Sequence, residues 1–189
     1  MNTFEKEELI ELWHESFGDS YEDIGLFFDM LFSPELVYVT KEDGKIVSAM
    51  YLTEGHELSE VLPDGSVKKY RLTYLYALAT KPSARGKGYG LRTVSGATEL
   101  AFKRGADIVT LCPADEGLEK WYRERAGFTG KSQAKSENEN PPAVKLAEDY
   151  VKLRDIFAEG KTEDLPDVVI YKTRENIFVP PFYFGPVLI

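Results

Sequence analysis

The sequence is poor in the residues that disulfide frameworks and most metal centres require. Its 189 residues include one cysteine, Cys112, and two histidines, His14 and His56. A single cysteine excludes a disulfide within the chain, and two isolated histidines offer no metal-ligand spacing, so we expect no metal site. The sequence also lacks any apolar run of the roughly 18 residues that a membrane span needs, and its first residues are acidic where a secretion signal would be basic and then apolar. We therefore expect a cytoplasmic protein with no membrane partner.

Basic residues are also in the minority. The chain has 23 lysines and arginines against 32 aspartates and glutamates, which gives a formal net charge of -9. Nucleic-acid binding depends on a clustered positive surface, so we expect no nucleic-acid partner. An acidic surface suits a cationic amine substrate, although such charge most often serves only solubility. The length fits a single domain with a full core.

The first half of the chain contains two helical patterns followed by extended ones. An apolar helical face opens at Asn2 or Thr3 and closes at Gly18, and a second helix has Ser20 as its cap and ends before Pro34. Four β-rich runs follow, separated by turn residues at 41–45 and 63–65. Their ranges are residues 35–40, 46–52, 54–62 and 67–80. This order predicts two helices and then a four-stranded antiparallel meander.

Three glycines then separate the fourth predicted strand from a helix that begins at Leu91. The segment reads Arg85-Gly86-Lys87-Gly88-Tyr89-Gly90. Glycines between a strand and a helix allow main-chain N–H groups to turn inward, and with the helix N-terminus they form an anion site suited to phosphate. A P-loop is excluded because Gly86-Lys87 is followed by Gly88 rather than by Ser or Thr. A dinucleotide fold is disfavoured because antiparallel strands precede the loop.

Residues 78–90 resemble the acyl-CoA signature of the GNAT superfamily of N-acetyltransferases, in which a strand is followed by (Arg/Gln)-x-x-Gly-x-(Gly/Ala). Arg85, Gly88 and Gly90 occupy its three defining positions, and Thr80 stands where the family often has Val. Residues 119–128 are similar to a second family motif, a helix followed by Gly-Phe. The resemblance covers residues 36–128, and residues 12–19 resemble the Eis-like branch.

The resemblance implies a mixed α/β (α+β) fold with a largely antiparallel central sheet, flanked by helices and splayed at the acyl-CoA site. We expect one domain over residues 1–189. Its parts would be a helical acceptor-side segment at 1–33, a core with the acyl-CoA motifs at 35–128, a polar loop at 129–143, and a helix, strand and apolar tail at 144–189. The helix is expected from an apolar stripe that ends at Gly160, and the strand is expected at residues 167–171. The apolar tail is expected either to pack on the body or to cover an interface between subunits. The family often forms dimers, which makes a homodimer the analogous expectation.

The same resemblance assigns roles to individual residues. Acetyl-CoA is the implied cosubstrate, held by Leu78, Ala79, Thr80, Arg85, Gly86, Lys87, Gly88, Tyr89 and Gly90. The main chain at the end of the strand would pair with the pantetheine arm. Tyr122 is the implied general acid, because a phenol can protonate a departing thiolate. The alternative is that Tyr122 only packs a helix against the sheet.

The general base is less well defined. Glu54 is the first candidate, and His56 lies on the same strand face two residues on. Tyr74 and Tyr76 share a strand face in the same way, and each of these four residues is more often an ordinary surface or packing residue. Cys112 could instead form an acyl-cysteine, but the sequence positions no base beside it, and a lone cysteine at a strand end is usually a small buried apolar residue.

These motifs predict an N-acetyltransferase that moves an acetyl or other acyl group from acetyl-CoA to a primary amine of a small molecule or peptide. Both substrates would be bound together, and the amine would attack the thioester directly. The alternative is a noncatalytic acyl-CoA-binding module of the same fold. No motif in the sequence identifies the acceptor amine.

Overall fold

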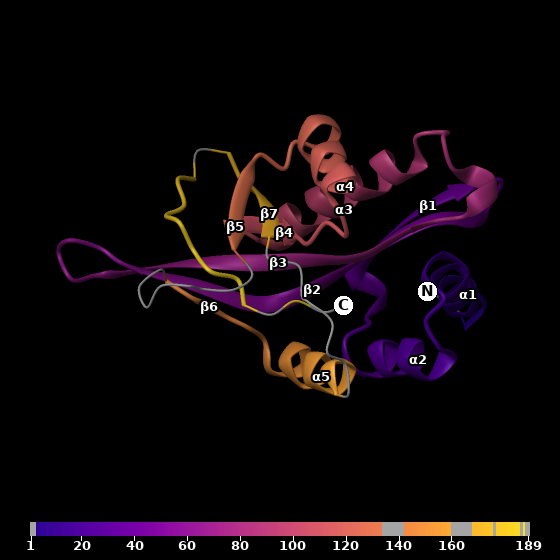
Figure 1. Ribbon diagram of the computed structural model, residues 1–189, viewed down its shortest axis with the longest axis horizontal. Helices are drawn as coiled ribbons and strands as arrows, with labels where there is room; N and C mark the ends of the chain where they lie inside the picture. Colours follow the sequence, from indigo (N-terminus) through magenta and orange to yellow (C-terminus); the bar gives the residue numbers. More distant parts are fainter. Residues whose placement is uncertain (1–2, 134–141, 160–167, 176, 186, 188–189) are drawn as a thin grey trace. The chain divides into compact units, whose positions relative to one another are not determined.

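The computed structural model describes residues 3–133, 142–159, 168–175, 177–185 and 187 of the chain (Figure 1). The helices are α1 (Thr3–Phe17), α2 (Tyr21–Met30), α3 (Tyr89–Arg104), α4 (Glu116–Trp121) and α5 (Glu148–Ala158), with short 3-10 helices η1 (Pro34–Leu36) and η2 (Pro82–Ala84) and a π-helical turn η3 (Tyr122–Ala126). The strands are β1 (Val37–Glu42), β2 (Lys45–Val61), β3 (Val67–Thr80), β4 (Ile108–Leu111), β5 (Gly130–Gln133), β6 (Val144–Lys145) and β7 (Val168–Thr173).

These strands form one sheet in the order β1-β2-β3-β4-β7-β5, and β6 pairs with β2. The pairing of β3 with β4 is parallel, whereas β1–β2, β4–β7, β5–β7 and β2–β6 are antiparallel. The predicted mixed α/β class with a largely antiparallel sheet is therefore confirmed. The chain forms two compact units, one of Met1–Thr53 with Leu75–Leu100 and one of Glu54–Tyr74 with Ala101–Ile189. The assignment of residues 1–189 to one domain stays a prediction.

The helices of the first unit begin and end where local chemistry directs. The Ser20 side chain accepts a hydrogen bond from the Asp23 N–H (3.0 Å), which caps α2. Gly18 has φ +77° and its N–H donates to the His14 carbonyl (2.9 Å), so α1 ends as the glycine predicts. The helix α2 ends at Met30, before Pro34, and Pro34 opens η1. Both helices follow the expectation from the sequence.

The hairpin β1–β2 is closed by Asp43 and Gly44, both with positive φ, as a two-residue type I′ turn requires. Two neighbouring residues of β1 contact different helices. The Thr40 hydroxyl hydrogen bonds to the Thr93 hydroxyl of α3 (2.8 Å), whereas Lys41 forms an ion pair with Glu5 of α1 (2.6 Å). The register of the hairpin shifts between Thr40 and Lys41, and the two residues contact two different helices.

The predicted four-stranded meander is wrong in one respect. Residues 46–52 and 54–62 do not form two strands but one continuous strand, β2. Only Thr53 lies between the two runs, and Gly55 inside the second run has a φ of +85°, an irregularity that does not reverse the chain. The turn before β3 is present, with the Leu62 N–H donating to the Ser66 carbonyl (2.8 Å).

The second unit has its own core, in which aromatic rings enclose a histidine. The His56 ring lies edge-on to Tyr150 with centroids 4.8 Å apart, and Phe184 stacks on Tyr74 at 5.2 Å. These four residues come from β2, α5, β3 and the C-terminal segment, and each is at most 2% exposed. Phe184 shows that the described part of the apolar tail packs on the body, although Phe178 in the same segment is 81% exposed.

Three further expectations concern the C-terminal third. The expected loop at 129–143 contains the strand β5, which pairs with β7 because alternate residues such as Ser132 can face the interior. The expected strand at 167–171 is present as β7, which lies between β4 and β5 in the sheet. Asp167, Gly160 and residues 134–141 lie outside the described part of the chain.

Candidate active site

The glycine-rich loop starts from a fixed point at the end of β3 in the first unit. The Lys81 N–H donates to the Val47 carbonyl (2.9 Å), which extends the pairing of β2 to the first residue after β3. The chain then turns through η2, and Nε of Arg85 donates back to the Thr80 carbonyl (3.2 Å). The guanidinium of Arg85 therefore ties the loop to the strand end.

The loop itself has the backbone of an anion cradle. Gly86 and Gly88 have φ of +78° and +82°, a region that residues with a side chain rarely adopt. A Cβ built at either position would meet no atom within 4 Å, so the space beside the main chain is open to a ligand. The N–H groups of residues 86–91 donate no main-chain hydrogen bond of ordinary geometry to a described residue. These free donors precede the positive end of α3, which is the arrangement that binds phosphate.

The helix α3 begins at Tyr89, two residues earlier than the sequence suggested. Gly90 therefore lies in the first helical turn, and its φ is not positive. A Cβ there would be 3.5 Å from the Thr80 Oγ1 atom, which is ordinary van der Waals contact. Gly86 and Gly88, and not Gly90, are the glycines that the loop conformation requires.

Glu42 is part of this site and was not expected from the sequence. The Tyr89 hydroxyl donates to Oε1 of Glu42 (2.5 Å), and Nζ of Lys87 lies 3.5 Å from the same oxygen. The hydrogen bond from Tyr89, and then the charge of Lys87, holds the pKa of Glu42 below its usual range. Glu42 is the last residue of β1, so only the hairpin geometry brings it to the loop.

The end of β3 is shaped by Ser48 and by a strained residue. The Ser48 hydroxyl donates to the Ala79 carbonyl (2.7 Å) and lies 2.9 Å from Oγ1 of Thr80. Ala77 has φ +52°, which interrupts the regular strand directly before Leu78. A positive φ at a residue with a side chain costs free energy and often marks a functional segment. The strain lies beside Leu78 and Ala79, and the family resemblance implies that the N–H of one of them faces the thioester oxygen.

Tyr122 begins the π-helical turn η3 in the second unit and is 6% exposed. Its ring packs edge-on against Trp121 (4.9 Å between centroids) and Phe128 (6.1 Å). Its hydroxyl makes no hydrogen bond to any residue that the structure describes. Burial raises the pKa of Tyr122, so the phenol keeps its proton at neutral pH. A protonated phenol is what a general acid needs, but the same burial also fits the packing alternative.

The candidate bases differ in their surroundings. Glu54 accepts two hydrogen bonds from Arg104, at 2.6 Å from Nε and 2.9 Å from Nη2, so its carboxylate is held in an ion pair. His56 is 2% exposed, its Nδ1 accepts a hydrogen bond from the Ala147 N–H (3.2 Å), and burial lowers its pKa to about 4. These contacts hold both side chains in place. The role of Glu54 or His56 as the base stays a prediction.

Cys112 and the two histidines do not combine into a reactive or metal-binding group. Burial raises the pKa of the Cys112 thiol to about 12, and Sγ lies 3.5 Å from the Val168 carbonyl. His14 is on α1, where it stacks on Tyr21 with ring centroids 4.4 Å apart. Within the described ranges, no three His, Cys, Asp or Glu side chains gather as metal ligands. None of the described helices is long and apolar enough to cross a membrane.

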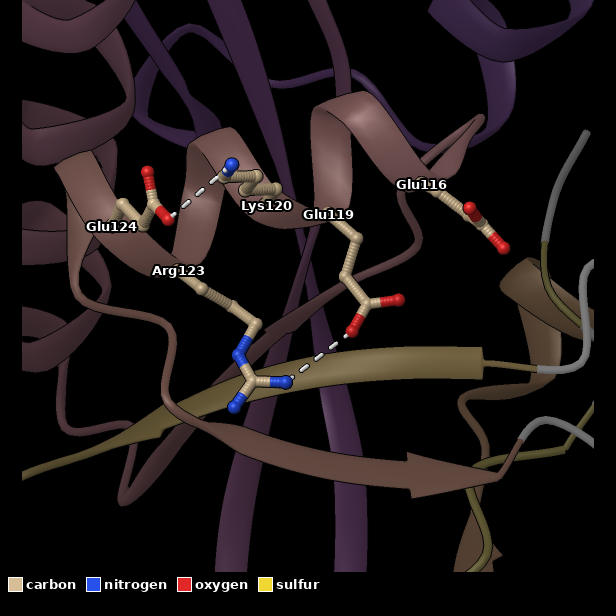
Figure 2. Close-up of a pocket in the computed structure, with 5 residues that line it drawn as sticks. All are labelled: Glu116, Glu119, Lys120, Arg123 and Glu124. Carbon is tan, nitrogen blue, oxygen red and sulfur yellow. Dashed lines mark hydrogen bonds and ion pairs between the residues drawn. The ribbon is translucent and has the colours of Figure 1, made fainter.

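A hollow on the surface of α4 and η3 is lined only by charged side chains, as Figure 2 shows. Its lining residues are Glu116, Glu119, Lys120, Arg123 and Glu124. Arg123 pairs with Glu119 at 3.4 Å and Lys120 pairs with Glu124 at 3.9 Å, both four residues apart on the helix. Exposed pairs of this kind contribute little free energy and are typical of a solvated helix face.

The Acetyltransferase (GNAT) family matches residues 4–128 of the chain. The chain therefore belongs to the GNAT family of acetyltransferases, which confirms the resemblance found in its motifs. No curated protein matches the sequence closely enough to count as a relative.

Solved structures share the fold at low sequence identity. Eis1 from Mycobacterium abscessus has a TM-score of 0.51 and 13% identity, over 70% of this chain and 32% of that one. Glucosamine-6-phosphate N-acetyltransferase from Arabidopsis thaliana has a TM-score of 0.51 and 19% identity, over 74% and 95%. A GNAT family acetyltransferase from Brucella melitensis, solved with acetyl-CoA, has a TM-score of 0.50 and 18% identity, over 68% and 79%. The chain thus spans about a third of the length of Eis1 and most of the smaller enzymes.

Proposed function

We propose that this chain is a cytoplasmic N-acetyltransferase that moves the acetyl group of acetyl-CoA to a primary amine while both substrates are bound. Membership of the GNAT family supports acetyl transfer from acetyl-CoA in general. The observation that carries the proposal for this chain is the loop of Gly86 and Gly88, whose left-handed backbone leaves N–H donors free before α3. These residues fit a pyrophosphate, because the donors and the open space lie on the main chain itself.

Binding of acetyl-CoA, stabilisation of the developing charge and protonation of the leaving group can each be assigned to residues of this chain. Acetyl-CoA supplies an activated thioester and a thiolate leaving group. The N–H groups of residues 86–91 hold its pyrophosphate, and the main chain from Leu78 to Thr80 pairs with the pantetheine arm. An N–H at Leu78 or Ala79 stabilises the negative charge that develops on the thioester oxygen. The family resemblance assigns to the Tyr122 hydroxyl the proton for the departing thiolate.

Direct attack by the amine is favoured over an acyl-cysteine. A nucleophilic thiol must ionise, and burial raises the pKa of Cys112 to about 12. Among the described residues, the geometry singles out none as the base that deprotonates the amine. The assignment of Glu54 as the base is supported only by its position on β2. The amine would therefore enter in its neutral form or lose its proton to water.

The test is release of free CoA, followed with a thiol reagent, from acetyl-CoA and a panel of polyamines, aminoglycosides, amino acids and peptides. Acetyl transfer predicts amine-dependent release with a matching acetylated product by mass spectrometry. A noncatalytic acyl-CoA-binding module predicts that acetyl-CoA raises the melting temperature while no amine causes release. That second result would overturn the proposed activity and leave the binding site intact.

A further inference from the structure

Asp19 is held in a defined orientation in the turn between α1 and α2. Nε1 of Trp13 donates a hydrogen bond to Oδ2 of Asp19 (2.7 Å), and Nδ1 of His14 lies 2.8 Å from the Asp19 carbonyl. Both the carboxylate and the main chain of Asp19 are therefore tied to α1. Oδ1 of Asp19 accepts no hydrogen bond from any residue that the structure describes, and the residue is exposed. One carboxylate oxygen is thus oriented by the protein and the other is available to a ligand.

The same tryptophan connects Asp19 to the strand that leads to the CoA loop. The Trp13 ring lies edge-on to Tyr76 of β3, with centroids 5.5 Å apart, and packs on Phe27 at 4.8 Å. Burial raises the pKa of Tyr76, and the charge of Asp19 raises it further, which agrees with a short distance between carboxylate and phenol. Tyr76 directly precedes the strained Ala77. All of these residues belong to the first unit, as does the CoA loop.

This places an oriented negative charge close to the predicted transfer point. Tyr76 and Leu78 are two residues apart in the chain, so their Cα atoms lie at most about 7 Å apart. The family resemblance implies that the N–H of Leu78 or Ala79 faces the thioester oxygen. A group bound at Asp19 would therefore lie within one short aliphatic chain of the acetyl group.

We propose that Asp19, oriented by Trp13, binds an ammonium group of the acceptor, and that the acceptor carries a second amino group that is acetylated. This inference rests on the proposed acetyltransferase activity. The substrate class is then a diamine or polyamine, or another compound with two separated amino groups. Asp19 acts as a specificity-determining residue and Trp13 as its positioning residue.

The bound ammonium and the attacking amine must be different groups for a physical reason. Attack on a thioester needs a neutral amine with a free electron pair. An ion pair with a carboxylate favours the charged form of its partner, which raises the pKa of that amine. An amine held by Asp19 therefore keeps its proton and cannot attack, whereas a second amine on the same molecule lies farther from the carboxylate and can lose its proton. The attacking nitrogen forms the new bond to the acetyl carbon as the carbon–sulfur bond breaks, and its proton passes to solvent.

The experiment compares putrescine, which has two amino groups, with n-butylamine, which has the same carbon chain and one. Wild-type protein should show a lower KM for putrescine. Asp19→Asn should raise the KM for putrescine about fivefold, the size of an exposed ion pair, with little change in kcat and no change in the KM for n-butylamine. Trp13→Phe, which removes the hydrogen-bond donor and also shortens a buried ring, should change the KM for putrescine in the same direction, and its melting temperature separates the loss of the donor from a loss of packing. Glu22→Gln, which removes an exposed carboxylate from the first turn of α2, is the matched control and should leave both KM values unchanged.

The outcomes separate this inference from the proposed function. The inference is wrong, and Asp19 only fixes the turn, if wild-type protein has the same KM for n-butylamine as for putrescine. The same conclusion holds if Asp19→Asn changes both KM values equally. If neither of these amines nor any other amine in the panel is acetylated, the proposed activity itself is overturned. A melting temperature for Asp19→Asn within the range of the Glu22→Gln control shows that the KM effect does not come from unfolding.

Discussion

The Tyr89 hydroxyl donates a hydrogen bond to Oε1 of Glu42 over 2.5 Å, and Lys87 lies 3.5 Å from the same oxygen. A carboxylate at the end of β1 thus holds two side chains of the loop that is predicted to receive a pyrophosphate. Its charge opposes the anion, while its hydrogen bond keeps the loop in place. The two effects can be separated by substitution.

Glu42→Gln should tighten acetyl-CoA binding by about threefold at low salt, because it removes a negative charge near the phosphates and keeps an acceptor for Tyr89. The gain should disappear at high salt, where charges on the surface are screened. Glu42→Ala removes the acceptor as well and should not tighten binding. Calorimetric titration with acetyl-CoA at two salt concentrations measures both variants. Equal tightening by Gln and Ala would show that the hydrogen bond to Tyr89 has no role in the loop.

Gly88→Val should abolish the rise in melting temperature that acetyl-CoA causes, because a β-branched residue cannot adopt φ +82° without strain and its side chain occupies the open space beside the loop. Gly90→Ala should keep that rise, because Gly90 is helical and has room for a Cβ. Differential scanning fluorimetry with and without acetyl-CoA decides the point. Retained stabilisation in Gly88→Val would place the CoA site elsewhere.

Tyr122→Phe should lower kcat by about a hundredfold and leave the affinity for acetyl-CoA unchanged, because a general acid acts in the transition state. Trp121→Phe alters the neighbouring ring but leaves the Tyr122 hydroxyl in place, and it serves as the control. Steady-state kinetics and a binding titration test the pair. Similar kcat values in wild type and Tyr122→Phe would assign Tyr122 to packing alone.

His56 should make the protein sensitive to acid. Its pKa is about 4 in the folded state, against 6.5 in the unfolded chain, so the unfolded chain binds more protons between these values. The stability that depends on neutral His56 is therefore fully present above pH 6.5. The free energy of unfolding decreases by about 3 kcal/mol as the pH falls from there toward 4. Urea denaturation of wild type, His56→Gln and the control His14→Gln across this range measures it. An unchanged pH dependence in His56→Gln would contradict the buried, neutral state of His56.

Cys112→Ala should retain most of the activity, with sequential bisubstrate kinetics in both proteins. The reason is the raised pKa of the thiol, which leaves almost no thiolate at neutral pH. Mass spectrometry of the wild type after incubation with acetyl-CoA alone should show no acetyl group on Cys112. An adduct that an added amine removes would establish an acyl-enzyme and overturn direct attack.

Local sequence signals predicted the elements and the loop correctly where a few adjacent residues determine the backbone. Ser20 caps α2, Asp43 and Gly44 close the first hairpin, and Gly86 and Gly88 form the turn before α3. The same signals did not decide whether residues 46–52 and 54–62 form two strands, as predicted, or one, as in β2. Only the pairing of the neighbouring strands distinguishes these outcomes.

The sequence alone determined the family, the glycine-rich loop and the absence of a cysteine framework, since each can be read from the residues themselves without their partners in space. The tertiary structure decided which distant side chains meet. Glu42 reaches Lys87 and Tyr89 because β1 ends beside the loop, and Trp13 brings Asp19 near Tyr76 because α1 packs on β3. Burial likewise decided the charge of His56 and the pKa of Cys112. Such contacts and solvent exclusion arise only when segments separated by tens of residues pack together, and no local pattern records them.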